Sequence, residues 1–359
     1  MSDANLQVID HTLHFHFEAG TSRGVLTQKK SYYVIIRSEG KTGIGEAGPL
    51  AGLSPDYEED CLPTFQKNLK KLGPIPTEKS GISAYVQQIP FDKPALRFAV
   101  ESALLDLFAE KSGRYFDNSF SRGEWGIPIN GLIWMGKPDF MASQIEQKLK
   151  DGYTCLKLKI GALDFETELG LLSNLRARFS KEQLTLRVDA NGAFSPEAAA
   201  SKLEKLAKYD LHSIEQPIQA GQWDEMAKLC RQEIIPIALD EELIGHENPA
   251  TVLEAIKPQF AIFKPSFLGG FEATRSWIEA CEKRAIDWWI TSALESNIGL
   301  QAISQFTAEY PVNMPQGLGT GQLYTNNFAS GLGIDRGNIY FDPTFPREIP
   351  LQGLSLSKI

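Results

Sequence analysis

The sequence predicts a parallel α/β barrel that follows a separate α+β domain. Five short apolar segments each end in an acid or a lysine, at Lys159, Asp189, Glu215, Asp240 and Lys264, and the intervals between these residues are 30, 26, 25 and 24. Such an interval fits one strand, one helix and two short loops, which is the repeating unit of a parallel α/β fold. Before residue 120, by contrast, apolar and polar residues alternate as in half-exposed antiparallel strands.

The charged strand ends indicate an enzyme. A charge at the C-terminal end of one strand after another is costly in a core unless these ends meet at a site. In a closed barrel they do meet, and the catalytic face lies there. The periodicity therefore predicts both a fold and the position of its active site.

Composition limits the classes of partner. The chain has 359 residues, of which 42% are hydrophobic and 23% charged, enough for a barrel and a second domain. Its net charge of −9 argues against nucleic acid or an anionic membrane as a partner. An anionic substrate, such as a small carboxylate, would need locally placed cations or a metal. The sequence does not define the oligomeric state.

Cysteine usage and hydropathy favour a cytoplasmic protein. The four cysteines are scattered without a CxxC pair, so we expect reduced thiols and neither a disulfide framework nor a zinc site. No basic stretch followed by an apolar one opens the chain, so we expect no signal peptide. No run approaches the roughly 20 apolar residues of a membrane span.

The first domain is expected over residues 1–120. Residues 6–17 and 31–40 are predicted strands, and a Gly-rich turn is expected over 40–50. Helical periodicity follows over 56–72 and 94–111. Strands that precede helices in this way are typical of an α+β domain.

The barrel is expected over residues 121–323. A strand over 127–134 precedes a helix over about 137–150, which ends at Asp151-Gly152. Seven strands are predicted between 127 and 294, and the position of an eighth, near 311–323, is poorly defined. Residues 324–359 are rich in Gly, Pro and Asn and are expected to pack back on the first domain.

Helix start signals support this division. Ser195 is a predicted N-cap, with Pro196 at the first helical position and Glu197 in the first turn. The signals place a helix directly after the segment that ends in Asp189, as the strand–helix order requires.

Three acids follow consecutive predicted strands. Asp189, Glu215 and Asp240 would be neighbours on one arc of the barrel rim, where carboxylates repel one another unless a cation lies among them. Oxygen ligands suit Mg²⁺, or Mn²⁺ as its substitute, better than zinc. The alternative is that each acid caps a helix or pairs with a lysine. Three in succession, with lysines on the strands before and after, favour the metal site.

Lysines flank the acids. Lys157 and Lys159 are two residues apart on one strand, so both point to the same face, and their apolar neighbours point to the helices. Two ammonium groups near a divalent cation favour a neutral lysine with a depressed pKa, which can act as a general base. Lys264 would face Lys159 across the site. A metal with two opposed lysines is suited to removing a proton α to a carboxylate and stabilising the enediolate.

The order KxK, D, E, DE, K on successive strands resembles the enolase superfamily, in its muconate-lactonising subgroup. Members of that subgroup have an α+β capping domain on a (β/α)7β barrel, a modified TIM barrel. Within it, finer strings resemble the o-succinylbenzoate synthase family over nearly the whole chain: TSRGVLTQK (21–29), GEAGPLAGLS (45–54), PINGLIWMG (128–136), VDANGAF (188–194), FKPSFLGGF (263–271) and TSALESNIGL (291–300).

The resemblance implies a reaction and its residues. It implies Mg²⁺-dependent syn-dehydration of 2-succinyl-6-hydroxy-2,4-cyclohexadiene-1-carboxylate to o-succinylbenzoate, a precursor of menaquinone. Lys159 would remove the α-proton, and Lys264 would stabilise the enediolate. Lys157 would tune Lys159 and contact the substrate carboxylate. The acids at 189, 215 and 240 would bind the metal.

Further residues are candidates for substrate contact or for support of the site. Arg23 is expected either to meet the anionic tail of the substrate or to be a structural arginine. One of three residues after the seventh strand is expected to touch the substrate. For Asn191, a position near the metal and a hydrogen bond at the strand end are equally compatible with the sequence. The substrate candidates are Asn130, Arg23, Ser292, Glu295 and Ser296, and the supporting candidates are Asn191 and Glu241.

Other functions remain as alternatives. An N-succinylamino acid racemase or a dipeptide epimerase would use the same metal and lysines. Dipeptide epimerases usually carry a DxD pair near the last strand, where this chain has GLGTGQLYTNN (317–327) and no acid. A catalytically silent binding protein is disfavoured, because all three acids and both opposed lysines are present.

Overall fold

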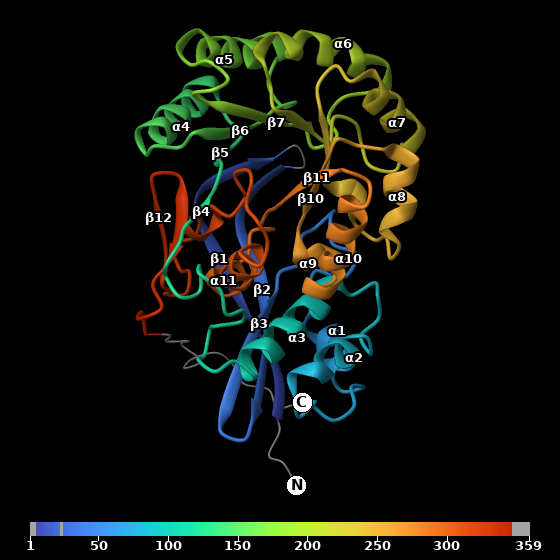
Figure 1. The fold of residues 1–359 in the computed structure, drawn as a ribbon, viewed down its shortest axis with the longest axis vertical. Helices are drawn as coiled ribbons and strands as arrows, with labels where there is room; N and C mark the ends of the chain where they lie inside the picture. Colours follow the sequence, from blue (N-terminus) through green and yellow to red (C-terminus); the bar gives the residue numbers. More distant parts are fainter. Residues whose placement is uncertain (1–4, 22–23, 347–359) are drawn as a thin grey trace.

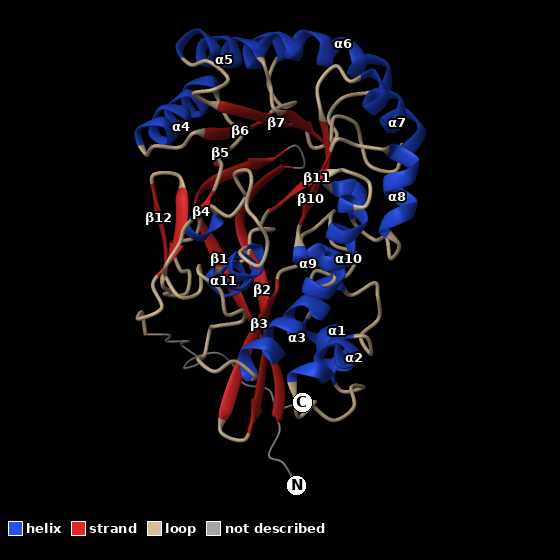
Figure 2. Cartoon of the chain, in the orientation of Figure 1, coloured by secondary structure: helices blue, strands red, loops and turns tan. Residues whose placement is uncertain are grey.

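The structure is a computed structural model that describes residues 5–21 and 24–346. An antiparallel sheet with three helices lies beside a barrel of parallel strands, whose helices form an arc on its outer side (Figures 1 and 2). The predicted fold class is confirmed: a (β/α)7β barrel with an N-terminal α+β capping domain. In the described chain, no helix is both long enough and apolar enough to cross a membrane.

The capping sheet has the order β1-β2-β3 and is antiparallel throughout. Its strands are β1 (Asn5–Thr21), β2 (Gly24–Ser38) and β3 (Lys41–Ala47). The β1–β2 hairpin extends toward the barrel strands (Figure 1), and Gly20 forms a bridge with Met135 there. The capping domain thus reaches the C-terminal ends of the barrel strands.

The predicted Gly-rich turn over 40–50 is wrong over most of its length. The turn is confined to Glu39 and Gly40, which have φ values of 51° and 76°, and β3 follows at once. Gly43 and Gly45 lie within β3, where helix α3 (Pro94–Leu107) packs closely. A Cβ at Gly45 would lie 1.9 Å from the carbonyl oxygen of Ala99, so this glycine permits close packing and makes no turn.

The helices of the capping domain are shorter than predicted. The structure has α1 (Leu62–Leu69), α2 (Ile82–Val86) and α3, which ends at Leu107. Residues 56–61 form no helix, because the side chain of Asp56 serves another helix: its Oδ2 accepts hydrogen bonds from Ala95 N at 2.9 Å and Leu96 N at 3.3 Å. Periodicity alone does not reveal this commitment of Asp56.

Seven parallel strands form the barrel sheet in chain order, β5 to β11. They are β5 (Gly131–Ile133), β6 (Cys155–Lys159), β7 (Thr185–Asp189), β8 (Ser213–Glu215), β9 (Ile237–Leu239), β10 (Phe260–Phe263) and β11 (Asp287–Ile290). The helices after them are α4 (Pro138–Lys150), α5 (Phe165–Arg178), α6 (Pro196–Leu206), α7 (Trp223–Gln232), α8 (Pro249–Ile256), α9 (Pro265–Leu268), α10 (Phe271–Glu282) and α11 (Asn297–Thr307).

The eighth barrel position is held by an irregular segment around Gln316. Gln316 N donates to Pro128 O at 2.8 Å, and Gly317 N donates to Ile290 O at 2.9 Å. The side chain of Gln316 also accepts from Ile290 N at 2.8 Å. A side chain therefore takes the place of a ladder bond, which explains why no strand pattern appears in the sequence.

The predicted strand over 127–134 is divided in the structure. Residues Ile127–Pro128 form β4, which pairs with β13 (Asn338–Phe341) in a separate sheet, and only β5 joins the barrel. The predicted helix signals are confirmed: α4 ends at Asp151-Gly152, and Ser195 Oγ accepts from Ala198 N at the start of α6.

The segment after 323 contacts both parts of the molecule. Asn326 Nδ2 donates to Thr12 O at 2.8 Å, and Tyr324 forms a bridge with Phe15 of β1. The hairpin of β12 (Leu332–Asp335) and β13 then pairs with β4. The domain boundaries at 120 and 323 stay a prediction, and residues 347–359 lie outside the described part of the chain.

Candidate active site

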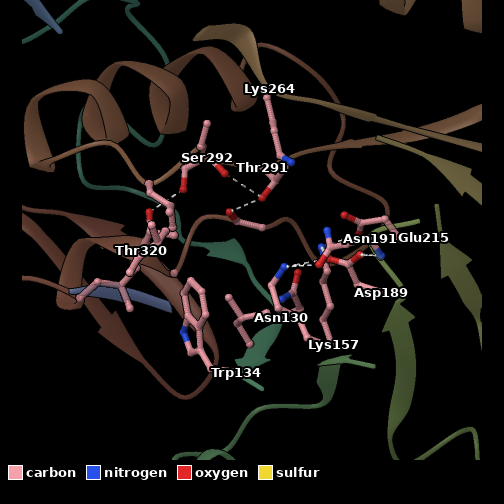
Figure 3. Close-up of a pocket in the computed structure, with 18 of the residues that line it drawn as sticks. Asn130, Trp134, Lys157, Asp189, Asn191, Glu215, Lys264, Thr291, Ser292 and Thr320 are labelled. Atoms are coloured by element: carbon pink, nitrogen blue, oxygen red, sulfur yellow. Dashed lines mark hydrogen bonds and ion pairs between the residues drawn. The ribbon is translucent and has the colours of Figure 1, made fainter. Parts of the chain in front are cut away.

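A cavity of about 430 Å³ lies at the C-terminal ends of the barrel strands. Both parts of the molecule contribute to its wall. Figure 3 shows residues of the barrel part, with Lys157, Asp189 and Lys264 among them. From the capping domain come apolar residues, namely Phe17, Val25, Leu26, Leu50, Ala51 and Leu53. From the barrel come Lys157, Lys159, Asp189, Glu215 and Lys264. The cavity thus has an apolar side and a charged side.

Strand register brings the acids to one level. Lys159 pairs with Asp189 between β6 and β7, and Asp189 pairs with Glu215 between β7 and β8. Asp240 follows β9 directly, and Lys264 follows β10. The three acids are only 1–2% exposed, so their charges need compensation from within the protein.

The lysines supply that compensation. Lys157 Nζ lies 3.1 Å from Asp189 Oδ2 and also pairs with Glu215. Lys159 Nζ lies 3.3 Å from the same Asp189 oxygen. Lys264 forms an ion pair with Asp240 and approaches from the side of the cavity opposite Lys157 (Figure 3). The structure therefore brings the three predicted acids and three predicted lysines together.

Burial and charge act against each other on these groups. Burial lowers the pKa of Lys157, but the carboxylates of Asp189 and Glu215 outweigh it and hold this pKa above its ordinary value. The pKa of Lys264 is raised in the same way, mainly by Asp240. The sequence predicts a lysine pKa that is depressed by a nearby cation. The pKa values of Lys157 and Lys264 are raised here, because carboxylates are the charges that surround these two lysines.

Burial and neighbouring charges shift the pKa values of Asp189 and Glu215 in opposite directions. Burial raises the pKa of Asp189, but Lys157 and Lys159 outweigh it and hold the pKa below its usual range. The pKa of Glu215 lies well above its ordinary value, because of burial and the neighbouring Asp189 carboxylate. The negative charge of Glu215 is thus less compensated than that of Asp189.

The donor set fits a hard divalent cation. Among the described residues, no three acid, histidine or cysteine side chains form a ready-made ligand cluster, and the acids are turned toward lysines. However, Glu215 Oε1 is buried and has no hydrogen-bond partner in the part of the chain that the structure describes. Three buried carboxylates on adjacent strands, one with an unpartnered oxygen, offer the oxygen ligands that Mg²⁺ prefers.

Two asparagines also lie at the cavity. Asn191 Oδ1 accepts a hydrogen bond from Lys159 Nζ at 2.8 Å, while its Nδ2 donates to Glu241 Oε1 at 3.0 Å. Asn191 thus connects a predicted base to a predicted supporting acid. Asn130 is 5% exposed, and its Oδ1 faces no hydrogen-bond partner in the described chain, so it can accept a bond from a ligand.

The candidates after the seventh strand are not placed together. Ser292 lines the cavity and its Oγ lies 2.5 Å from Thr320 Oγ1. Glu295 and Ser296 are fully buried away from it: Glu295 accepts from Ser266, and Ser296 donates to a capping-domain carboxylate, Glu46. They therefore have structural partners in place of a substrate. Arg23 lies outside the described residues.

Sequence analysis missed several residues of the cavity wall. Leu132 and Trp134 line it together with Asn130, because alternate residues of the segment 130–134, which contains β5, point inward. Lys159 Nζ lies 5.9 Å from the centroid of the Trp134 ring. The period of two within the string PINGLIW was the signal that could have identified both residues.

Comparisons with known proteins point to one family. Residues 140–341 match the family described as Enolase C-terminal domain-like. The chain is 50% identical to an o-succinylbenzoate synthase from Desulfotalea psychrophila over 94% of this chain and 99% of that protein.

Solved structures agree. The crystal structure of MenC from Desulfotalea psychrophila aligns with a TM-score of 0.83 at 46% identity, over 94% of this chain and 99% of that one. A dipeptide epimerase from Enterococcus faecalis, solved with Mg and the dipeptide L-Leu-L-Tyr, aligns with the same TM-score at 20% identity, over 95% and 97% of the two chains. The second likeness shows a shared fold only.

Proposed function

The chain belongs to the enolase superfamily, within the o-succinylbenzoate synthase family, and we propose that it is the hydro-lyase that converts 2-succinyl-6-hydroxy-2,4-cyclohexadiene-1-carboxylate to o-succinylbenzoate. This reaction would serve menaquinone biosynthesis. Mg²⁺ would be the metal, with Mn²⁺ as a substitute.

The observation that carries the proposal is the placement of lysines on both sides of a buried acid layer. Lys159 lies beside Asp189, and Lys264 pairs with Asp240 from the other side. A flat ring held between them would present its α-hydrogen to one lysine and its carboxylate charge to both.

Lys159 would be the general base. It would take the proton from C1, the ring carbon that carries the carboxylate, and the electron pair of that C–H bond would remain on the ring. Asn191 orients the Lys159 ammonium through the 2.8 Å hydrogen bond, so the same contact would direct its neutral form toward the substrate.

Loss of water would complete the reaction. The electron pair left at C1 forms the new ring double bond as the C6–O bond breaks, and Lys159 returns its proton to the departing hydroxide. Lys264 would stabilise the negative charge that develops on the other side of the ring. Loss of water alone gives the third double bond of the aromatic ring, so no oxidant or reductant is needed.

Asp189, Glu215 and Asp240 would hold the metal. Bound there, Mg²⁺ would supply Lewis-acid stabilisation of the carboxylate as it gains enediolate charge. Lys157, which already contacts two of these acids, would adjust the electrostatics at Lys159 and contact the substrate carboxylate. Glu241 would support the site through Asn191.

The remaining cavity wall suits an acyl tail. Asn130 and Ser292 would bind polar groups of the substrate, and the apolar residues of the capping domain would cover its methylene groups. Arg23 is proposed as a partner of the tail carboxylate. A cytoplasmic location is consistent with Cys61, Cys155, Cys230 and Cys281, all of which are free and buried.

The proposal is tested by following the ultraviolet absorbance of the cyclohexadiene substrate with purified protein. We expect turnover with Mg²⁺ and none with EDTA. N-succinylamino acids, assayed in parallel for α-proton exchange, test the racemase alternative, since two opposed lysines also suit that reaction. Exchange on these compounds without dehydration would contradict the synthase. A dipeptide epimerase is not favoured, because residues 317–327 contain no acid to meet a peptide ammonium.

A further inference from the structure

The loop between β11 and α11 forms one wall of the cavity and contains a strained residue. Ser292, Ala293 and Leu294 all line the cavity. Leu294 has a φ of +66°, in the left-handed region that a branched side chain rarely adopts. Such a conformation persists only when the surrounding contacts hold it.

Two hydrogen bonds hold the backbone of Leu294. Lys29 Nζ donates to its carbonyl oxygen at 2.7 Å, and Tyr324 Oη donates to the same oxygen at 2.7 Å. Lys29 belongs to β2 of the capping domain and is only 4% exposed. A buried charge from one part of the molecule is therefore bonded to the cavity wall of the other.

Carboxylates on both sides of Lys29 make its burial tolerable. Glu46 and Glu295 both favour its charged form, although burial as the larger effect lowers the pKa of Lys29. Room is also left for the ammonium: a Cβ at Gly48 would lie 2.3 Å from Lys29 Nζ. A larger residue at this position would have to displace the ammonium from its present place.

The two carboxylates extend the contact along the loop. Glu46 accepts hydrogen bonds from Ser296 N at 2.9 Å and from Gly299 N at 3.0 Å, at the start of α11. Glu295 accepts from Ala293 N at 2.6 Å and from Ser266 Oγ at 2.5 Å, two residues after Lys264. The loop is thus fixed at both ends, and its middle carbonyl is held by Lys29.

Lys29 could also be buried simply as the cation of an ion pair between the capping domain and the barrel. The hydrogen bond of Lys29, however, goes to the backbone of a cavity-lining residue and not to either carboxylate. The lysine therefore fixes the shape of the wall in addition to joining the two parts of the molecule.

We propose that Lys29 is a positioning residue that determines substrate specificity: from the capping domain it holds the left-handed turn at Leu294 and so sets the width of the cavity for the acyl tail of the substrate. The identity of that tail rests on the proposed function, whereas the effect on the wall does not.

Two substitutions separate charge from hydrogen bonding. Lys29→Met keeps the length of the side chain but removes the donor and the charge, and Tyr324→Phe removes only the second donor to Leu294 O. The matched control is Lys30→Met, because Lys30 neighbours Lys29 on β2 and pairs at the surface with Asp10 and Asp60. Lys29→Arg keeps the positive charge and tests whether this charge restores the function of the lysine.

We expect Lys29→Met to raise KM for the cyclohexadiene about tenfold, equivalent to about 1.4 kcal/mol, while kcat changes little. Tyr324→Phe should raise KM less, Lys29→Arg should recover part of the loss, and Lys30→Met should match the wild type. A fall in kcat at unchanged KM, or no change in either constant, would overturn the proposal.

A crystal structure of Lys29→Met, or of Tyr324→Phe if the first variant does not fold, gives a readout that is independent of the substrate. We expect the carbonyl of Leu294 to rotate and its φ to leave the left-handed region. An unmoved Leu294 in the variant would overturn the proposal even if the enzyme is a synthase. Absence of cyclohexadiene turnover in the wild type would instead count against the proposed function, and the structural comparison would still decide the role of Lys29.

Discussion

Asn191 is the residue that directs the side chain of Lys159. Its own backbone has a φ of +44°, which asparagine tolerates better than most residues, and its Oδ1 accepts the 2.8 Å hydrogen bond from Lys159. The left-handed backbone at the end of β7 thus turns an amide toward the lysine of β6. A loop conformation and the orientation of the proposed general base are linked in one residue.

Replacing Asn191 by glycine removes the amide without a backbone cost. Because a hydrogen bond to a charged group contributes about 1.5–3 kcal/mol, we expect kcat of Asn191→Gly to fall about tenfold or more, with KM nearly unchanged. Steady-state kinetics with Mg²⁺ measure both constants. Asn191→Ala is the companion variant: it should show the same kcat and unfold more easily, since alanine disfavours this φ. A wild-type kcat in Asn191→Gly would show that the contact is unimportant.

Individual residues show how far sequence reasoning extends. The acids and lysines could be predicted because each lies in the C-terminal part of a strand or directly after it, and these strand ends meet in a barrel. Glu295 and Ser296 also follow a strand, but they are bonded to Ser266 and Glu46, which come from other elements. Such partners are distant in the chain, so spacing cannot distinguish an anchoring residue from a binding residue.

Helix α3 packs closely on β3 at the glycines of that strand. A Gly→Ala substitution there should therefore have the opposite effect to one at an exposed helical glycine. Gly45→Ala should lower the free energy of unfolding by about 1–3 kcal/mol, because its Cβ would lie 1.9 Å from Ala99 O. Gly170→Ala, in α5, meets nothing within 4 Å and should raise stability by about 0.5–1 kcal/mol. Urea denaturation measures both. Equal effects of the two substitutions would contradict the close packing at β3.

Helix α10 begins at a carboxylate supplied by α3. Glu101 is buried and accepts hydrogen bonds from Phe271 N at 2.6 Å and Glu272 N at 3.1 Å. Burial raises the pKa of Glu101 to about 7, although these bonds oppose the shift. The folded protein therefore binds this proton more tightly than the unfolded chain does.

A raised acid pKa makes stability increase as pH falls. The stabilisation by this proton is complete below the unfolded pKa near 4.5 and is lost as pH rises through about 7. The difference corresponds to about 3 kcal/mol. We expect the free energy of unfolding of the wild type, relative to Glu101→Gln, to rise by up to this amount between pH 8 and pH 5. Parallel pH profiles of the two proteins would refute the raised pKa.

At the level of elements, regular patterns were predictable and irregular ones were not. The start of α6 at Ser195 and the end of α4 near Gly152 could be predicted, because helix caps depend on local sequence. The eighth barrel position could not be defined, because Gln316 replaces ladder bonds by its side chain. The extent of β3 was missed for a similar reason: its glycines are there because α3 packs closely against them, and α3 is distant in sequence.

A metal bound at the proposed site would stabilise the folded molecule as a whole. Buried carboxylates that repel one another destabilise the folded state, and a bound cation would relieve this. We expect Mg²⁺ at about 100 times its dissociation constant to raise the free energy of unfolding by about 2.7 kcal/mol. Thermal or urea unfolding with Mg²⁺ and with EDTA measures the effect.

Two variants show whether the acid layer is the origin of that stabilisation. Asp240→Asn should lose most of it, whereas Glu225→Gln, which changes a surface acid paired with Lys228, should retain it. The same Mg²⁺ response in Asp240→Asn and in the wild type would place the metal elsewhere.

The spacing of strands predicted the barrel because one unit repeats along the chain. The cavity is less visible in the sequence, since its wall combines residues 17, 24–26, 50, 51 and 53 of the capping domain with residues between 317 and 323 near the end of the barrel. Chemistry at the charged strand ends and shape at the apolar wall therefore have separate origins. The positions of the charged residues could be predicted from strand spacing, whereas the apolar wall could not, because its residues come from distant parts of the chain.

The most direct test of the account is the initial rate of loss of the cyclohexadiene, at saturating Mg²⁺, for the wild type and Lys159→Ala. A positioned general base contributes roughly 10²- to 10⁴-fold, so we predict rapid turnover by the wild type and a loss of at least this size in the variant, with the Mg²⁺ stabilisation intact. A comparable rate in Lys159→Ala would contradict the assignment of Lys159 as the base and, with it, the proposed mechanism.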